Sequence, residues 1–161
     1  MIRGDFTKNK LLIIISIIIT ILWMLIIYNF SETSSVDSNN SSKAIIRNIV
    51  EKFVHDEKEV SKLVIKINKP FRKCAHASVY FVLGLFVNSI ILYFNKNIKI
   101  CNLISIIFCY IYASFDEFHQ TFIVGRTGQI SDVLIDGFGA IMGCIIFNLL
   151  YKKVKDKKAC N

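Results

Sequence analysis

Long apolar runs separated by shorter polar segments are the main pattern along this chain. Four runs consist almost wholly of apolar residues: 11–28, about 71–94, about 100–115 and about 132–151. Since roughly 20 apolar residues in a helix cross the hydrocarbon of a bilayer, the pattern predicts an all-α membrane protein with four transmembrane helices. Trp23 and Tyr28, late in the first run, are expected to lie at the membrane interface, where such amphipathic rings concentrate.

The segment between the first two runs has a different pattern. Residues 31–43 (SETSSVDSNNSSK) read as a polar, low-complexity linker with no apolar period. Within residues 44–69, Val60, Leu63, Val64 and Ile67 recur at the i, i+3, i+4, i+7 spacing of a helix. This predicts one or two amphipathic helices, lying either on the membrane surface, capping the bundle, or in solvent. Pro70 is expected to separate them from the second span.

The chain therefore divides into four parts. They are an N-terminal transmembrane helix (1–30), the polar and amphipathic segment (31–69), a three-helix core (70–151) and a basic tail (152–161). Residues 1–30 begin with basic residues as a signal peptide does, but the apolar run is too long and no A-x-A cleavage site follows. We interpret this part as an uncleaved first span.

Composition supports the membrane assignment and adds an orientation. Hydrophobic residues make up 53% of the chain, and the net charge is +8. The basic residues gather at the ends of the apolar runs, which favours contact with anionic headgroups over binding to nucleic acid. Ten of the twenty Lys and Arg residues lie in the short segments 1–10, 95–99 and 152–161. Short loops rich in Lys and Arg stay in the cytoplasm, so both termini of this multi-pass cell-membrane protein are expected there and segment 31–69 outside.

A cluster of ionisable residues follows the third run, within YASFDEFHQTFIVGRTGQISDVLID (residues 112–136). Charge next to hydrocarbon is costly, so such a cluster is a candidate site. At 100° per residue, three helices each carry a polar stripe that continues into small residues. The stripes are Lys73, His76, Tyr80 and Gly84; Ser105, Cys109, Tyr112, Asp116 and Gln120, with Glu117 beside them; and Asp132, Asp136, Gly139 and Gly143. We expect them to meet in a shared interior at the outer leaflet, with His119 turned towards headgroups or water.

The charges of this cluster allow more than one role. Arg72, Lys73 and Arg126 nearly balance Asp116, Glu117, Asp132 and Asp136, as in a structural charge clamp. Glycines flank Arg126, however, and a guanidinium in a glycine-rich loop is suited to bind phosphate or carboxylate. A metal site formed by His76, Glu117, Asp132 and Asp136 is chemically possible. No metal-binding spacing supports it, and the five cysteines form no CxxC pair, so we expect neither a metal nor a cofactor.

Three sequence blocks resemble the VanZ-like family of small bacterial membrane proteins. They are R-K-x-x-H-x-x-x-Y-x-x-L-G at 72–84, D-E-x-x-Q-x-F-x-x-G-R at 116–126 and D-V-L-I-D-x-x-G-A-x-x-G at 132–143. Two positions depart from the family pattern: Val124 stands where a proline is common, and Asp136 where Asn is frequent. The resemblance implies a cell-envelope protein associated with glycopeptide resistance, particularly to teicoplanin. The usage of Ile, Asn and Lys is typical of a low-GC Gram-positive source.

The first functional hypothesis is a non-enzymatic protein that binds or shields an anionic lipid, a wall precursor or an amphiphilic antibiotic. Its expected partners are thus membrane lipids or these ligands, and its ligand-binding residues are expected to be Arg72, Lys73, His76, Tyr80, Asp116, Glu117, Gln120, Arg126, Asp132 and Asp136. The alternative is a membrane-embedded enzyme on a lipid-linked phosphate, with His76 or Glu117 as general base. A charge clamp alone is the third possibility. A proton-coupled transporter ranks last, because its carboxylates belong near the midplane.

Overall fold

The structure is a computed structural model that describes residues 3–32, 35–95 and 97–159. These residues form five helices and no strand: α1 (Arg3–Glu32), α2 (Ser35–Val50), α3 (Glu57–Phe94), α4 (Ile98–Gln120) and α5 (Ile130–Ala159). All except α2 are long and apolar enough to cross a membrane. The predicted fold class, an all-α protein with four membrane-spanning helices, is confirmed.

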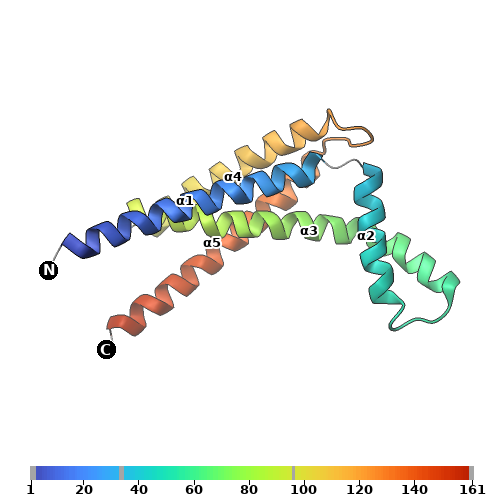
Figure 1. The fold of residues 1–161 in the computed structure, drawn as a ribbon, viewed down its shortest axis with the longest axis horizontal. Helices are drawn as coiled ribbons and strands as arrows, with labels where there is room; N and C mark the ends of the chain where they lie inside the picture. The colour runs from blue at the N-terminus through green and yellow to red at the C-terminus, as the bar shows by residue number, and fades with distance from the viewer. Residues whose placement is uncertain (1–2, 33–34, 96, 160–161) are drawn as a thin grey trace.

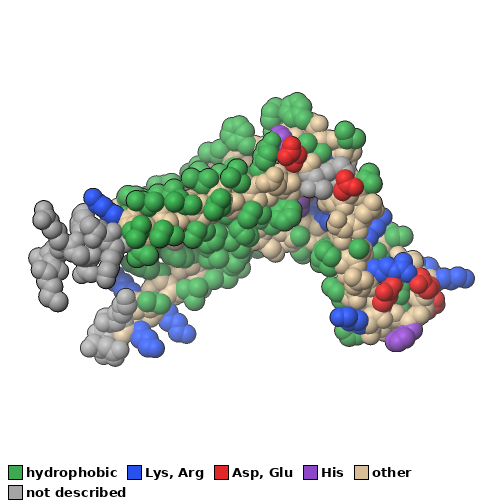
Figure 2. Space-filling view, viewed as in Figure 1, with side chains coloured by type: hydrophobic (Ala, Val, Ile, Leu, Met, Phe, Trp, Pro, Cys, Tyr) green, Lys and Arg blue, Asp and Glu red, His purple; other side chains and the backbone are tan. Residues whose placement is uncertain are grey.

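The four long helices run side by side, and α2 lies across one end of them (Figure 1). The described ends of α1 and α5 lie together at the opposite end of the bundle. We call α2 together with residues 57–69 of α3 the arm, because these two segments project beyond the spans. Apolar side chains cover the visible side of the bundle, whereas charged side chains gather at its ends and on the arm (Figure 2). This distribution is the one expected of a protein whose bundle is surrounded by lipid.

Helices α3 and α5 approach one another through glycine. A Cβ atom at Gly84 would collide with the backbone of Ala140, and one at Gly139 with the backbone of Ala77. Gly143 lies in the same way against the backbone of Phe81. Small residues allow this close approach between helices in a membrane, where van der Waals contact is a main source of association. The predicted small-residue stripes of the second and fourth spans therefore face each other.

A second set of interhelical contacts is polar and lies deep in the bundle. The amide of Asn88 on α3 donates to Asn148 Oδ1 at 3.1 Å and to the carbonyl of Cys144 at 3.3 Å, both on α5. Its own Oδ1 accepts from Ser105 on α4 at 3.2 Å. Asn148 in turn donates to Asn102 on α4 at 2.6 Å. These side chains link three helices into one network. The network was not predicted from the sequence, although an amide inside an apolar run is itself a signal of such bonding.

Two sequence expectations about the connecting segment were wrong. Pro70 does not separate two helices, because α3 continues through it. A proline removes one helical hydrogen bond, and Figure 1 shows α3 changing direction near α2, where it leaves the bundle. The polar linker also does not extend to residue 43, since α2 begins at Ser35. This helix has no apolar period in its first turns, and contacts with α3 stabilise it instead: Ser42 of α2 donates to Asn68 of α3 at 2.5 Å.

Trp23 and Tyr28 of α1 contact other helices of the bundle. The indole of Trp23 donates to the carbonyl of Val79 at 3.0 Å and packs edge-on against Phe86. Trp23 therefore ties α1 to α3. Tyr28 contacts His119, with ring centroids 4.8 Å apart. His119 is thus half-buried against α1.

The glycine contact between α3 and α5 gives a direct test of the packing. Gly84→Val places a branched side chain against the backbone of Ala140, which cannot move aside without separating the helices. Overpacking of this kind costs about 1–3 kcal/mol. We expect a lower midpoint of unfolding by SDS in detergent micelles. Ser78→Val is the matched control on the same helix, since Ser78 is exposed and bonds only within α3. An equal effect of both substitutions would contradict this packing.

Candidate functional site

The candidate site lies at the end of the bundle that carries the arm. Its side chains come from the middle of α3, the last turns of α4, the first turns of α5 and the loop between α4 and α5 (residues 121–129). Gly125 in this loop has a φ of 75°, a left-handed conformation that a β-branched residue adopts only with strain. Glu117 fixes the end of the loop, because its carboxylate accepts from the backbone N–H of Gln129 at 2.9 Å.

A polar cavity of about 330 Å³ opens among these elements. Seven of the ten predicted ligand-binding residues line it: Arg72, Lys73, His76, Glu117, Gln120, Arg126 and Asp132. Asn39, Asn68 and Lys69 of the arm complete one side of it. Sequence reasoning missed this contribution, because Asn39 lies in the segment that was read as a linker.

One ion pair spans this cavity. Lys73 of α3 and Asp132 of α5 are 2.5 Å apart, and both side chains are about 30% exposed (28% and 31%). The pair joins the two helices that meet through glycine. Within the described part of the chain, neither Arg72 nor Arg126 forms a salt bridge with a carboxylate.

The two arginines are instead held by neutral oxygens. Arg72 donates to Asn39 Oδ1 at 2.8 Å, and Asn68 donates to the same oxygen at 3.0 Å. Arg126 donates to the carbonyl of Phe30 on α1 at 3.2 Å, and its buried Nε finds no hydrogen-bond partner among the described residues. Burial lowers the pKa of the Arg126 guanidinium, and the positive charge of Arg72 lowers it further. Two guanidinium groups that repel each other and keep free donors are suited to receive an anion.

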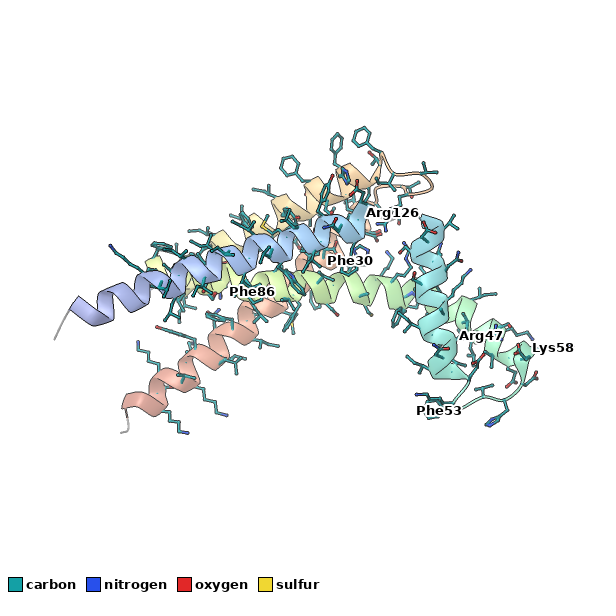
Figure 3. The ribbon with its side chains drawn as sticks, in the orientation of Figure 1. Phe30, Arg47, Phe53, Lys58, Phe86 and Arg126 are labelled. Carbon is teal, nitrogen blue, oxygen red and sulfur yellow. The ribbon has the colours of Figure 1, made fainter. Side chains whose placement is uncertain are left out.

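A second cavity, of about 420 Å³, adjoins the first and is lined mainly by apolar side chains. It lies between α1, α2 and α3, with Ile27 and Phe30, Ile45, and Phe71 and Val79 among its walls. We call it the apolar groove. Arg72, His76 and Arg126 line both cavities, so one basic wall separates the polar cavity from the apolar groove. Figure 3 shows Arg126 and Phe30 side by side at this end of the bundle.

The remaining predicted site residues lie deeper. Asp136 and Tyr80 are fully buried, and Asp116 is 5% exposed. Gln120 donates to Asp116 at 3.3 Å and to Ser31 of α1 at 3.2 Å. Within the described part of the chain, neither Asp136 oxygen has a hydrogen-bond partner. Tyr80 also reaches the apolar groove, but Asp116 and Asp136 line neither cavity. These two carboxyl groups belong to the packed base of the site, beneath the cavity.

The two candidate general bases, His76 and Glu117, have different surroundings. His76 lies on the basic wall, is half-buried, and lines both cavities. Glu117 is committed to a backbone N–H. Among the described residues, no group of three or more His, Cys, Asp or Glu side chains is placed to hold a metal ion. The geometry offers cationic donors, a polar chamber and an apolar chamber.

Comparison with known proteins agrees with the three sequence blocks. A family model described as VanZ/LLP1 matches residues 16–151, which covers α1 from its middle through most of α5. No curated protein and no solved structure matches the chain significantly. The matched range includes both cavities, the arm and the glycine contact between α3 and α5. The match extends over most of the length, so this chain belongs to the VanZ/LLP1 family.

Proposed function

We propose that this protein binds an anionic amphiphile, with the charged headgroup in the polar cavity and the apolar chain in the groove beside it. The observation that carries the proposal is the wall shared by the two cavities, formed by Arg72, His76 and Arg126. An amphiphile has its charge where its chain begins, and here the cationic donors stand where an apolar chamber meets a polar one. A clamp made only of balanced charges needs neither chamber.

Electrostatics favours an anion over a neutral or cationic headgroup. Lys69, Arg72, Lys73 and Arg126 line the polar cavity together with only two carboxylates, those of Glu117 and Asp132. Lys73 is neutralised by Asp132, and Glu117 accepts from the backbone. Lys69 and the two arginines therefore carry positive charge that no salt bridge among the described residues neutralises. Two unit charges 4 Å apart interact by about 4 kcal/mol at an effective dielectric constant near 20, so a phosphate between the guanidinium groups relieves their repulsion.

The apolar groove favours anionic ligands that carry an apolar chain over those that do not. A lipid chain already in the bilayer gains little from entering a groove, because lipid is as apolar as the side chains that line it. An amphiphile arriving from water gains about 0.8 kcal/mol for each buried CH₂. The groove thus keeps the chain in apolar surroundings while the head leaves the membrane surface for the polar cavity. Lipids, lipid-linked wall precursors and lipid-tailed antibiotics share this chemistry.

The orientation follows from the basic residues, and the link to resistance from the family. We propose that both termini are cytoplasmic and that the two cavities open at the outer leaflet of the cell membrane. At that surface the protein meets wall precursors and antibiotics of the glycopeptide class. By holding or covering such a ligand, it lowers the amount of antibiotic that reaches its target, as in teicoplanin resistance.

Reporter fusions test this orientation. We expect an alkaline phosphatase inserted at the tip of the arm, between Val54 and His55, to be active, because this enzyme folds only outside the cytoplasm. A fluorescent protein that folds only in the cytoplasm, placed after Asn161, is expected to fluoresce. The reverse result for both reporters would place the cavities in the cytoplasm and contradict a role at the outer leaflet.

Removing one arginine of the shared wall tests the headgroup site. Arg126→Ala deletes charge-assisted hydrogen bonds worth about 1.5–3 kcal/mol, so its affinity for phosphatidic acid is expected to fall roughly tenfold or more. Affinity is measured by titrating the lipid into the purified protein in detergent. Lys62→Ala is the control, because it removes an exposed charge of α3 that lines neither cavity. Unchanged binding with reduced abundance of Arg126→Ala would favour the charge clamp, and turnover of the lipid would favour the enzyme.

Filling the apolar groove tests whether the chain and the headgroup of the ligand occupy different cavities. Ala75→Trp places a large ring in the apolar groove and leaves Arg72 and Arg126 in place. We expect weaker binding of long-chain phosphatidic acid and unchanged binding of glycerol phosphate, which has no chain. Ser78→Trp, on the same helix but outside both cavities, is expected to alter neither. Equal loss of both ligands in Ala75→Trp would show that the chain does not occupy the groove.

A further inference from the structure

We propose that the arm lies on the bilayer surface and inserts an apolar stripe, made of Ile45, Ile49 and Phe53, among the headgroups and upper acyl carbons. All three side chains are exposed in the structure, by 51%, 50% and 79%. They recur every fourth residue, so they follow one side of α2 and of the turn after it. This inference concerns a surface outside both cavities, apart from Ile45, and does not depend on what the cavities bind.

The direction of the stripe is set by the groove. Ile45 lines the apolar groove together with Ile27 and Phe30 of α1, so this side of α2 is turned towards the spans. Helix α2 runs across the end of the bundle and not along it (Figure 1). A helix that crosses the end of a membrane bundle lies roughly parallel to the membrane plane. Ile49 and Phe53 then continue, beyond the edge of the bundle, the apolar side that Ile45 begins.

Another side of α2 packs against α3, and a further side carries ion pairs. Ile46 packs with Val60 and Val64 of α3 in a small apolar core that makes the arm a unit of its own. Arg47 pairs with Glu51 at 2.6 Å and with Glu57 at 2.9 Å, and all three side chains are exposed. Figure 3 shows Arg47 and Lys58 on the part of the arm away from the spans, while Phe53 lies at the end of α2. The arm therefore has a charged outer side, an inner core and the exposed stripe. Val36 and Ile65 are further exposed apolar residues of the arm, by 66% and 70%.

Two observations favour the bilayer as the cover of this stripe: the positive charge of residues 35–69, and the exposed apolar end of α1 beside the stripe. Residues 35–69 hold seven Lys and Arg against five Asp and Glu, and Arg47 engages two of the acids. The remaining cations suit anionic headgroups, as is typical of amphipathic helices at membrane interfaces. Phe30 of α1, which shares the groove with Ile45, is itself 60% exposed at the end of a membrane-spanning helix. The stripe is thus continuous with a surface that lipid already surrounds.

Fluorescence quenching by brominated lipid tests the depth of Phe53. Trp23 is the only tryptophan, so Trp23→Phe gives a background without it. In that background Phe53→Trp is compared with Lys58→Trp, in full-length protein reconstituted into phosphatidylcholine–phosphatidylglycerol vesicles. We expect lipids brominated on the upper acyl carbons to quench the Phe53→Trp protein at least twofold more than the Lys58→Trp protein, and aqueous acrylamide to show the opposite order. Equal quenching of the two proteins overturns the proposal.

A second measurement avoids the Trp23 substitution, which removes a hydrogen bond between α1 and α3. Phe53→Cys and Lys58→Cys are labelled with a membrane-impermeant maleimide in permeabilised membranes, and the signal of the unsubstituted protein is subtracted. We expect the thiol introduced by Phe53→Cys to be labelled at least fivefold more slowly than the one introduced by Lys58→Cys. Both are expected to react at similar rates after the membrane is dissolved in detergent.

Two outcomes of these measurements overturn the proposal in different ways. Rapid labelling of the Phe53→Cys protein in the membrane shows that water reaches the stripe. Protection that survives in detergent, or protection from acrylamide without quenching by bromolipid, shows that a protein surface covers it instead of lipid.

Discussion

The contact between α3 and α5 is the interaction on which the rest of the structure depends. Gly84, Gly139 and Gly143 let the two backbones touch, and a side chain at any of these positions would push the helices apart. Because the helices are this close, Lys73 and Asp132 meet one or two turns further along and close one wall of the polar cavity. Helix α4 then packs on this pair and brings Glu117 and Gln120 to the same end. The geometry of the site is therefore a consequence of helix packing.

Lipid offers no hydrogen bonds, so polar groups inside the bundle need partners within the protein. The two polar regions of the bundle differ in how far they find them. The polar side chains around Asn88 bond to one another across three helices. That region is structural, since each amide finds a protein partner where lipid offers none. At the other end, the arginines keep donors that no carboxylate uses, and two cavities open beside them. The contrast supports a ligand-binding role there, because the same bundle can pair its polar groups fully where packing alone is required.

The sequence was sufficient for the spans and for the shared interior, because hydropathy and the 100° helical repeat depend on local order alone. Tyr80, Gln120 and Asp136 are buried as their stripes predicted. The role of the arm was not predictable in the same way. Asn39 lies in a polar stretch whose helix is stabilised by contacts with Asn68 and Arg72, residues that follow 29 and 33 positions later. Pro70 misled for a related reason, since packing on both sides of it keeps α3 continuous. The apolar groove was also missed, because three helices build it together.

Native mass spectrometry of the protein extracted from its own membranes shows whether an anionic amphiphile occupies the shared basic wall. We expect a co-purifying molecule that carries both a phosphate or carboxylate and an apolar chain. Its occupancy is expected to fall when Arg72 and Arg126 are both replaced by Ala, and to persist when two exposed lysines outside the cavities, Lys62 and Lys66, are replaced. Protein that retains no such molecule, or retains it equally in both variants, would show that no anionic amphiphile is held by this wall.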